Sequence, residues 1–220
     1  MQAILNFDVL NAKQRQIRSS FPDDHGLGVH RALSWLHRAE LAGDDYDAAF
    51  IFYWIAYNAT YADDCAEAAA SSERGIFDDY FAKLLALDTS EEIYHAIWHR
   101  FSGPIRQLLA NRYVFQPFWN HQNQVAGCEN WEERFEASKR RIAIALAGQD
   151  TRIILTTLFD RLYVLRNQLV HGGATWNSSV NRDQVHDGAR ILAFLVPLFI
   201  DLMMDNPEIC WGAPYYPVVE

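Results

Sequence analysis

The sequence predicts an all-α helical bundle, because apolar residues recur at helical spacing along almost all of its 220 residues. Strict alternation of apolar and polar residues, which indicates half-buried strands, is hard to find anywhere. Half of the residues (50%) are hydrophobic and 14% are aromatic, a composition that excludes a disordered chain and supports a sizeable core. Glycines, prolines and short polar side chains mark where the helices should begin and end.

Two helices with clear boundaries are expected in the N-terminal half. The first covers residues 29–41 and carries a leucine stripe that ends at the sequence AGDD. Asp44 or Asp45 can cap the next helix, over residues 46–64, because a short acceptor side chain bonds the free amides of the first helical turn. This second helix is apolar on most sides, which indicates a central position in the core.

Several more helices are expected between residue 77 and the C-terminus. Thr89 with Glu92, and Asn130 with Glu133, stand in capping-box register, in which each side chain bonds the backbone amide of the other residue. Gly148 and the pair Gly172-Gly173 supply helix stops. The expected ranges are 77–87, 91–101, 105–113, 131–147, 151–171 and 183–204.

One helical domain over residues 1–220 is expected, because no linker, repeat or low-complexity tract interrupts the chain. Residues 114–124 have the least regular pattern. Pro197 falls inside the last helix and predicts a kink. The tail, residues 206–220, is rich in proline and aromatic residues, and we expect it to lie extended over the bundle.

Cysteine usage predicts a reducing cytoplasm, and the absence of a visible secretory signal or membrane-spanning stretch predicts a soluble protein. Cys65, Cys128 and Cys210 are far apart and odd in number, which argues against a disulfide framework and a cysteine zinc site. The N-terminal sequence shows no secretory signal, and the apolar stretch 191–204 is too short to span a bilayer.

The net charge of −9 disfavours general adhesion to nucleic acid or anionic membranes, so RNA would need a local basic groove.

The sequence RNQLVHGG, residues 166–173, ends the helix expected over 151–171. Asn167 and His171 are one helical turn apart, and the long Arg166 side chain can bring its guanidinium towards the imidazole. The core-facing side of this helix is a seam of leucines, and its back face mixes polar and aliphatic residues, which suggests a second contact surface such as a dimer interface. The seam comprises Leu155, Leu158, Leu162, Leu165 and Leu169.

Two interpretations of Arg166, Asn167 and His171 follow from the residues. An imidazole can donate and accept protons near neutral pH, and a guanidinium can hold a phosphate by parallel hydrogen bonds. With a polar positioning group, they suffice for attack of a ribose 2′-hydroxyl on its phosphodiester without a metal. The structural interpretation is that Arg166 and His171 satisfy the last helical carbonyls before glycine, and spacing alone favours this second interpretation.

Other candidate residues have simpler explanations. His95 and His99 have a metal-compatible spacing, but the sequence lacks the glutamate of a His-Glu-x-x-His site and a third ligand, so structural histidines are favoured. Lys139 to Arg141 are interpreted as part of a solvated helix face. Arg182 and Arg190 could line an RNA-binding groove beside His171 if the last helix folds back antiparallel, although ordinary surface charge is favoured.

The aromatic cluster in the second expected helix could stack on bases, but its helical spacing and density indicate core packing first. It comprises Tyr53, Trp54, Tyr57 and Tyr61. No glycine-rich phosphate loop, nucleophile elbow or dinucleotide fingerprint is present in the sequence. No cofactor or metal is therefore expected.

The sequence RLYVLRNQLVHGG, with its R-N-x-x-x-H motif late in an all-α chain and one long helix after it, resembles the HEPN family, the higher eukaryote and prokaryote nucleotide-binding domains. The earlier sequence GDDYDAAFIFYWIAYNATY is similar to the first helical region of larger prokaryotic members. The resemblance covers residues 28–70 and 150–205. It implies a HEPN-like bundle with additional helices, in which residues 150–205 hold the motif helix and its partner helix.

The resemblance also implies a function. Many HEPN proteins are homodimeric, metal-independent endoribonucleases that leave a 2′,3′-cyclic phosphate and a 5′-hydroxyl, and many act as toxins or phage-defence effectors. Carried over, Arg166 would bind the scissile phosphate, His171 would transfer protons and Asn167 would position the site. The alternative is a non-catalytic module that binds a nucleotide or a protein partner. In a toxin subgroup a tyrosine that is adenylylated stands where this chain has Gly173, so control by that chemistry and a matching antitoxin are not implied.

Overall fold

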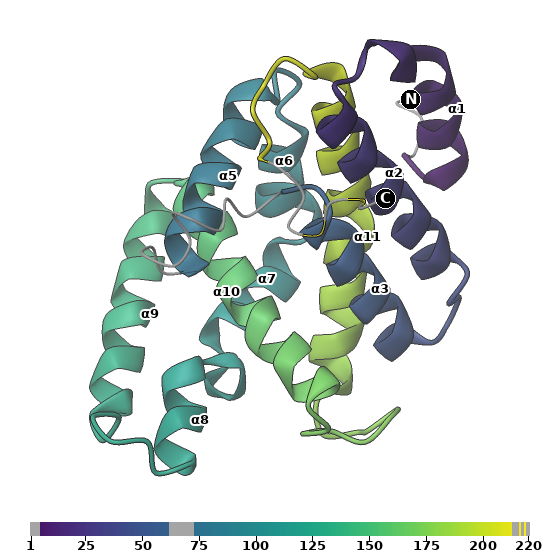
Figure 1. The fold of residues 1–220 in the computed structure, drawn as a ribbon. Helices are drawn as coiled ribbons and strands as arrows, with labels where there is room; N and C mark the ends of the chain where they lie inside the picture. The colour runs from purple at the N-terminus through teal and green to yellow at the C-terminus, as the bar shows by residue number, and fades with distance from the viewer. Residues whose placement is uncertain (1–4, 62–72, 213–215, 217, 219–220) are drawn as a thin grey trace. The chain divides into compact units, whose positions relative to one another are not determined.

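The computed structural model describes residues 5–61, 73–212, 216 and 218. Every regular element in these ranges is a helix, which confirms the predicted all-α class (Figure 1). The chain divides into two compact units, one formed by Met1–Ser90 with Trp176–Glu220 and the other by Glu91–Thr175. The R-N-x-x-x-H helix belongs to the second unit, and the long helix that follows it belongs to the first.

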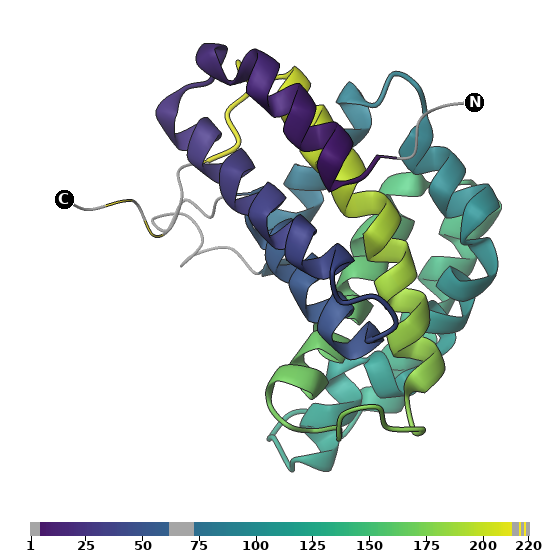
Figure 2. The same ribbon diagram turned by 90° about the vertical axis from the view of Figure 1, so that its right-hand side faces the viewer.

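The first unit is built on three helices that pack against one another, α2, α3 and α11. Helix α1 packs against α2 and α11 (Figure 2). Helix α5 packs against α11. Aromatic side chains fill the core, where the rings of Tyr57, Phe81 and Phe199 are completely buried. The elements are α1 Phe7–Ile17, η1 Arg18–Ser20, α2 Asp23–Glu40, α3 Tyr46–Asn58, α5 Glu73–Leu87 and α11 Arg182–Asp205.

Helix α3 begins where the sequence predicts. The Asp45 carboxylate accepts a hydrogen bond from the amide of Ala48 at 3.1 Å, the capping role expected of it. Tyr53, Trp54 and Tyr57 are buried, which confirms that they are core residues. The helix ends at Asn58, earlier than expected, and residues 62–64 of the expected range lie outside the described residues.

Helix α1 was not expected from the sequence, and α2 begins earlier than expected, at Asp23. Leu10 of α1 is completely buried. The Lys13 ammonium lies 2.6 Å from the carboxylate of Asp201 and 2.7 Å from that of Asp205, both on α11. These contacts join segments far apart in sequence, so local spacing gives little sign of them.

The second unit surrounds helix α10, which packs against α7, α9, η2 and η3. A small aromatic cluster of Phe115, Phe118 and Trp131 forms part of its core. The elements are α6 Glu92–His95, the π-helical turn η2 Ala96–Arg100, α7 Ser102–Ala110, η3 Arg112–Val114, α8 Gln116–Gln122, α9 Trp131–Ala147 and α10 Thr151–Val170.

Three expectations for this unit need correction. The expected helix over residues 91–101 is a short α-helix followed by a π-turn, and its N-cap is Glu91, whose left-handed backbone (φ 58°) takes the place of a Thr89 cap. The weakly patterned stretch 114–124 contains helix α8, with Pro117 in its first turn. Helix α9 has the expected bounds and ends at Gly148, but Asn130 forms no side-chain cap.

The C-terminal region agrees partly with expectation. Pro197 lies inside α11, as predicted. In the tail, Trp211 is buried and its indole donates to the Asn206 carbonyl at 3.0 Å.

Cys128 is buried and Cys210 exposed, both as free thiols, and Cys65 lies outside the described residues. None of the described helices is both long and apolar enough to cross a membrane.

Candidate active site at the end of helix α10

Helix α10 is held firmly at its start. The Asp150 carboxylate accepts a hydrogen bond from the amide of Ile153 at 2.9 Å, which caps the helix. The hydroxyl oxygen of Thr151 accepts a second bond from the indole of Trp98, also at 2.9 Å. Both contacts lie within the second unit, and they fix the position of the helix that carries the motif.

The predicted leucine seam is buried along most of its length. Leu155, Leu158, Leu162 and Leu165 are all 0% exposed, whereas Leu169 is half-buried. Val164, on the predicted back face, is also buried. From Arg166 to Leu169 the residues of α10 are half-buried, and Val170 at the end of the helix is exposed.

Arg161 is a buried cation of this helix that sequence reasoning missed. Its guanidinium donates to the Ser138 hydroxyl of α9 at 3.0 Å and lies 4.5 Å from the centre of the Phe115 ring. A cation over an aromatic face is stabilised by the ring's quadrupole, more strongly away from water. Arg161 thus packs α10 against α9. The sequence feature that could have indicated this role is an arginine beside the leucine seam.

The structure brings Arg166 and Asn167 together. The Arg166 guanidinium donates to the side-chain oxygen of Asn167 at 2.9 Å, and both residues are half-buried. His171 occupies the C-cap position of α10 and its side chain is exposed. Its backbone amide donates to the Asn167 carbonyl at 3.0 Å, whereas the hydrogen bond between side chains in the motif joins Arg166 and Asn167 and not the imidazole.

The two glycines close the helix by backbone bonds alone. The amide of Gly173 donates to the Gln168 carbonyl at 2.8 Å and that of Gly172 to the Leu169 carbonyl at 3.4 Å, the pattern of a Schellman motif. Gly172 has φ +70°, a conformation that favours glycine. At Gly173 a Cβ would come within 3.2 Å of the Gln168 carbonyl oxygen, so a side chain there would require the backbone to shift by a few tenths of an ångström.

Gln168 is a second residue that sequence reasoning missed. Its side-chain amide donates to the Tyr113 carbonyl at 2.6 Å, which ties the last turn of α10 to the η3 segment. Gln168 stands between Asn167 and Leu169, and nothing in this local sequence indicates a hydrogen-bond partner 55 positions away. The bond limits movement of the turn on which Arg166 and His171 are carried.

Arg182 and Arg190 lie on α11, in the first unit. The Arg182 guanidinium forms an ion pair with the Asp47 carboxylate at 2.7 Å and donates to the Asn177 side chain at 3.0 Å. Its Nε and Nη2 atoms are buried without a hydrogen-bond partner among the described residues. Arg190 is exposed. A role in RNA binding remains a prediction for both.

The remaining candidates are on the surface. His95 and His99 are exposed, with ring centres 5.4 Å apart. Within the part of the chain that the structure describes, no three metal-ligating side chains gather into a group. Lys139 is exposed and pairs with Glu136 on the same helix at 2.9 Å, in line with a solvated helix face.

Comparison with protein-family models, with curated proteins and with solved structures finds no match for this chain.

Proposed function

We propose that the protein is a metal-independent endoribonuclease of HEPN type that acts as a homodimer. Arg166 binds and polarises the scissile phosphate, and Asn167 holds the guanidinium in place through their hydrogen bond. His171 transfers protons as the ribose 2′-hydroxyl attacks the phosphorus. The products are a 2′,3′-cyclic phosphate and a 5′-hydroxyl. Such an activity suits a toxin or phage-defence effector.

One observation carries this proposal: backbone amides bond three of the last four carbonyls of α10. The amides of His171, Gly172 and Gly173 bond the carbonyls of Asn167, Leu169 and Gln168. In the structural interpretation of the motif, the side chains of Arg166 and His171 were expected to bond these carbonyls. With the carbonyls already bonded, those side chains are available for a substrate.

The exposed end of α10 supports the homodimer. Val170 is 48% exposed, beside the half-buried Leu169 and the exposed His171. An apolar residue next to polar, reactive ones on a rigid helix end is suited to contact with a second copy about a twofold axis. Two motifs brought together in this way would supply two arginines and two histidines to one RNA backbone.

The second candidate function is a non-catalytic module that binds a nucleotide or a protein through the same surface. The net charge of −9 favours this candidate, because a strongly acidic surface repels an RNA backbone. It predicts that the pure protein cuts no RNA but binds a ligand saturably, and that Arg166→Ala weakens this binding.

The test is incubation of the purified protein with end-labelled structured and unstructured RNAs in EDTA. We expect cleavage to fall by about 100-fold or more in Arg166→Ala and His171→Ala, the range of a lost acid–base or charge-stabilising group. His30→Ala and Arg106→Ala are matched controls, because both side chains are exposed and outside the motif. Unchanged cleavage by His171→Ala would contradict the assignment.

A further inference from the structure

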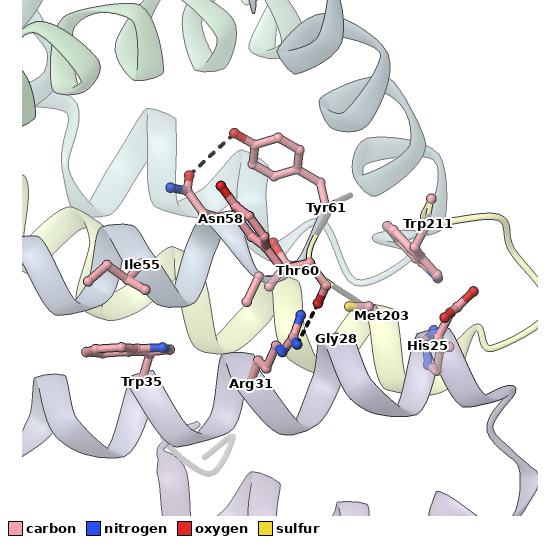
Figure 3. A pocket seen from close by; sticks show the side chains of 14 residues that line it. His25, Gly28, Arg31, Trp35, Ile55, Asn58, Thr60, Tyr61, Met203 and Trp211 are labelled. Atoms are coloured by element: carbon pink, nitrogen blue, oxygen red, sulfur yellow. Dashed lines mark hydrogen bonds between the residues drawn. The ribbon is translucent and has the colours of Figure 1, made fainter. Parts of the chain in front are cut away.

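A second candidate site lies in the first unit and shares no residue with the proposed active site. A pocket of about 530 Å³ is lined by residues of α2, by the C-terminal end of α3, by Met203 of α11 and by Trp211, Gly212 and Tyr216 (Figure 3). Its volume falls in the range of sites that hold small ligands. All of its lining residues belong to the same compact unit.

The pocket has aromatic and aliphatic walls. Trp35 and Ile55 lie at one end, His25 and Trp211 at the other, and Met203 lies between them (Figure 3). Trp35 is 37% exposed although it is a large aromatic residue. Walls of this kind favour a flat ring, which gains both apolar contact and stacking.

His25 is the observation that points to a ligand. The residue is only 7% exposed, yet neither ring nitrogen has a hydrogen-bond partner among the described residues. Burial lowers the pKa of His25, against an opposing effect of Glu208, so the ring is neutral and offers one donor and one acceptor. A buried polar group without a partner is costly, and a ligand with a polar edge would relieve that cost.

Arg31 gives the pocket a positive charge. Its guanidinium extends from α2 into the pocket, where one nitrogen donates to the Tyr216 carbonyl at 2.7 Å (Figure 3). A guanidinium has about five N–H donors, so others remain for a carboxylate. Asp24 also lines the pocket beside His25, which favours an anion at the Arg31 position rather than at the His25 end.

We propose that this pocket binds a small planar aromatic carboxylate. The ring packs against the aromatic walls, the carboxylate binds Arg31, and a polar edge of the ring bonds the neutral imidazole of His25. The site does not depend on RNA cleavage, since Arg166, Asn167 and His171 take no part in it.

Fluorine NMR titration with 5-fluoroindole-3-acetate tests the proposal on the full chain. We expect saturable binding with a Kd of about 1 mM or tighter, the affinity that ordinary ligand efficiency gives a molecule of this size. The neutral analogue 5-fluoroindole-3-acetamide should bind about tenfold more weakly, because it lacks the charge-assisted bond. Absence of saturable binding by the acetate, or equal affinities for both probes, would overturn the proposal.

Variants locate the binding. Arg31→Met should remove the preference for the acetate, and His25→Phe, which retains a buried ring, should weaken both probes several-fold. Arg106→Met is the control arginine, and His171→Ala should bind like the wild type. If the acetate binds equally well to Arg31→Met, His25→Phe and wild type, each shown folded by circular dichroism, the assignment to this pocket is wrong.

Discussion

The ion pair between Asp47 and Arg182 offers the most detailed prediction about stability. It joins the first turn of α3 to the first residue of α11, with the oxygen and nitrogen 2.7 Å apart. The Asp47 carboxylate also accepts the amide of Asn177 at 3.2 Å. Nearby, Trp176 donates to the Asp45 carboxylate at 3.2 Å. These bonds fix the start of α11 and the residues just before it.

The geometry sets the magnitude of the effect. At 2.7 Å and an effective dielectric constant of about 20, the gross attraction is about 6 kcal/mol, an upper bound that desolvation largely offsets. The Arg182 side chain is 26% exposed and the Asp47 side chain 13%. The pair is therefore intermediate between a surface ion pair, which contributes about 0–1 kcal/mol, and a fully buried ion pair. We expect Asp47→Asn to lower the free energy of unfolding by about 2 kcal/mol, because it leaves the Arg182 cation without its counter-ion.

Arg182→Met should cost less, about 1 kcal/mol, because it also removes two buried N–H groups that have no partner among the described residues. Urea denaturation of both single variants and the double variant measures the two costs and their coupling, expected at about 1 kcal/mol. Arg190→Met, an exposed arginine on the same helix, serves as the control. A cost of Arg182→Met equal to that of Asp47→Asn, or no coupling, would refute the reasoning.

Three further predictions concern helix packing, the motif turn and pH. Leu162→Ala, at a completely buried position, should cost about 3 kcal/mol, whereas Ile144→Ala, at a residue 74% exposed, should stay within about 0.5 kcal/mol by urea denaturation. Gly172→Ala should cost about 1 kcal/mol because φ is +70°, and equal thermal stability would contradict that backbone geometry. Burial lowers the pKa of Lys13, but its two aspartate partners on α11 outweigh burial and raise it above 10.5. The stability that Lys13 adds relative to Lys13→Met should therefore be fully present below pH 10.5 and be lost as the pH rises through the raised pKa of Lys13. Loss of this stability at neutral pH would contradict the prediction.

The helical class and several helix ends could be predicted because their signals are local. Gly148 ends α9, the two glycines end α10, and Asp45 caps α3, each through bonds within a few residues. Helix α1 depends instead on ion pairs of Lys13 with side chains more than 180 residues away. The π-turn at Ala96–Arg100 has no distinct spacing that would separate it from a regular helix.

The motif could be located from the sequence, but its surroundings could not. Spacing places Arg166, Asn167 and His171 at a helix end, and it cannot show which groups bond the last carbonyls. The structure assigns those bonds to backbone amides, which removes the structural interpretation's main support. The pocket around His25 was missed because its walls come from α2, α3, α11 and the tail, which only the folded chain brings together.

The central claim concerns chemistry at the end of α10, and one measurement addresses it directly. An RNA that the protein cuts in EDTA is resynthesised with a single 2′-deoxynucleotide at the cleaved position, and product ends are identified by mass spectrometry. We predict a cyclic phosphate on the natural RNA, no cleavage at the deoxy position, and cleavage of the natural RNA reduced about 100-fold or more in His171→Ala. Cleavage at the deoxy position, or wild-type cleavage by His171→Ala, would contradict the account.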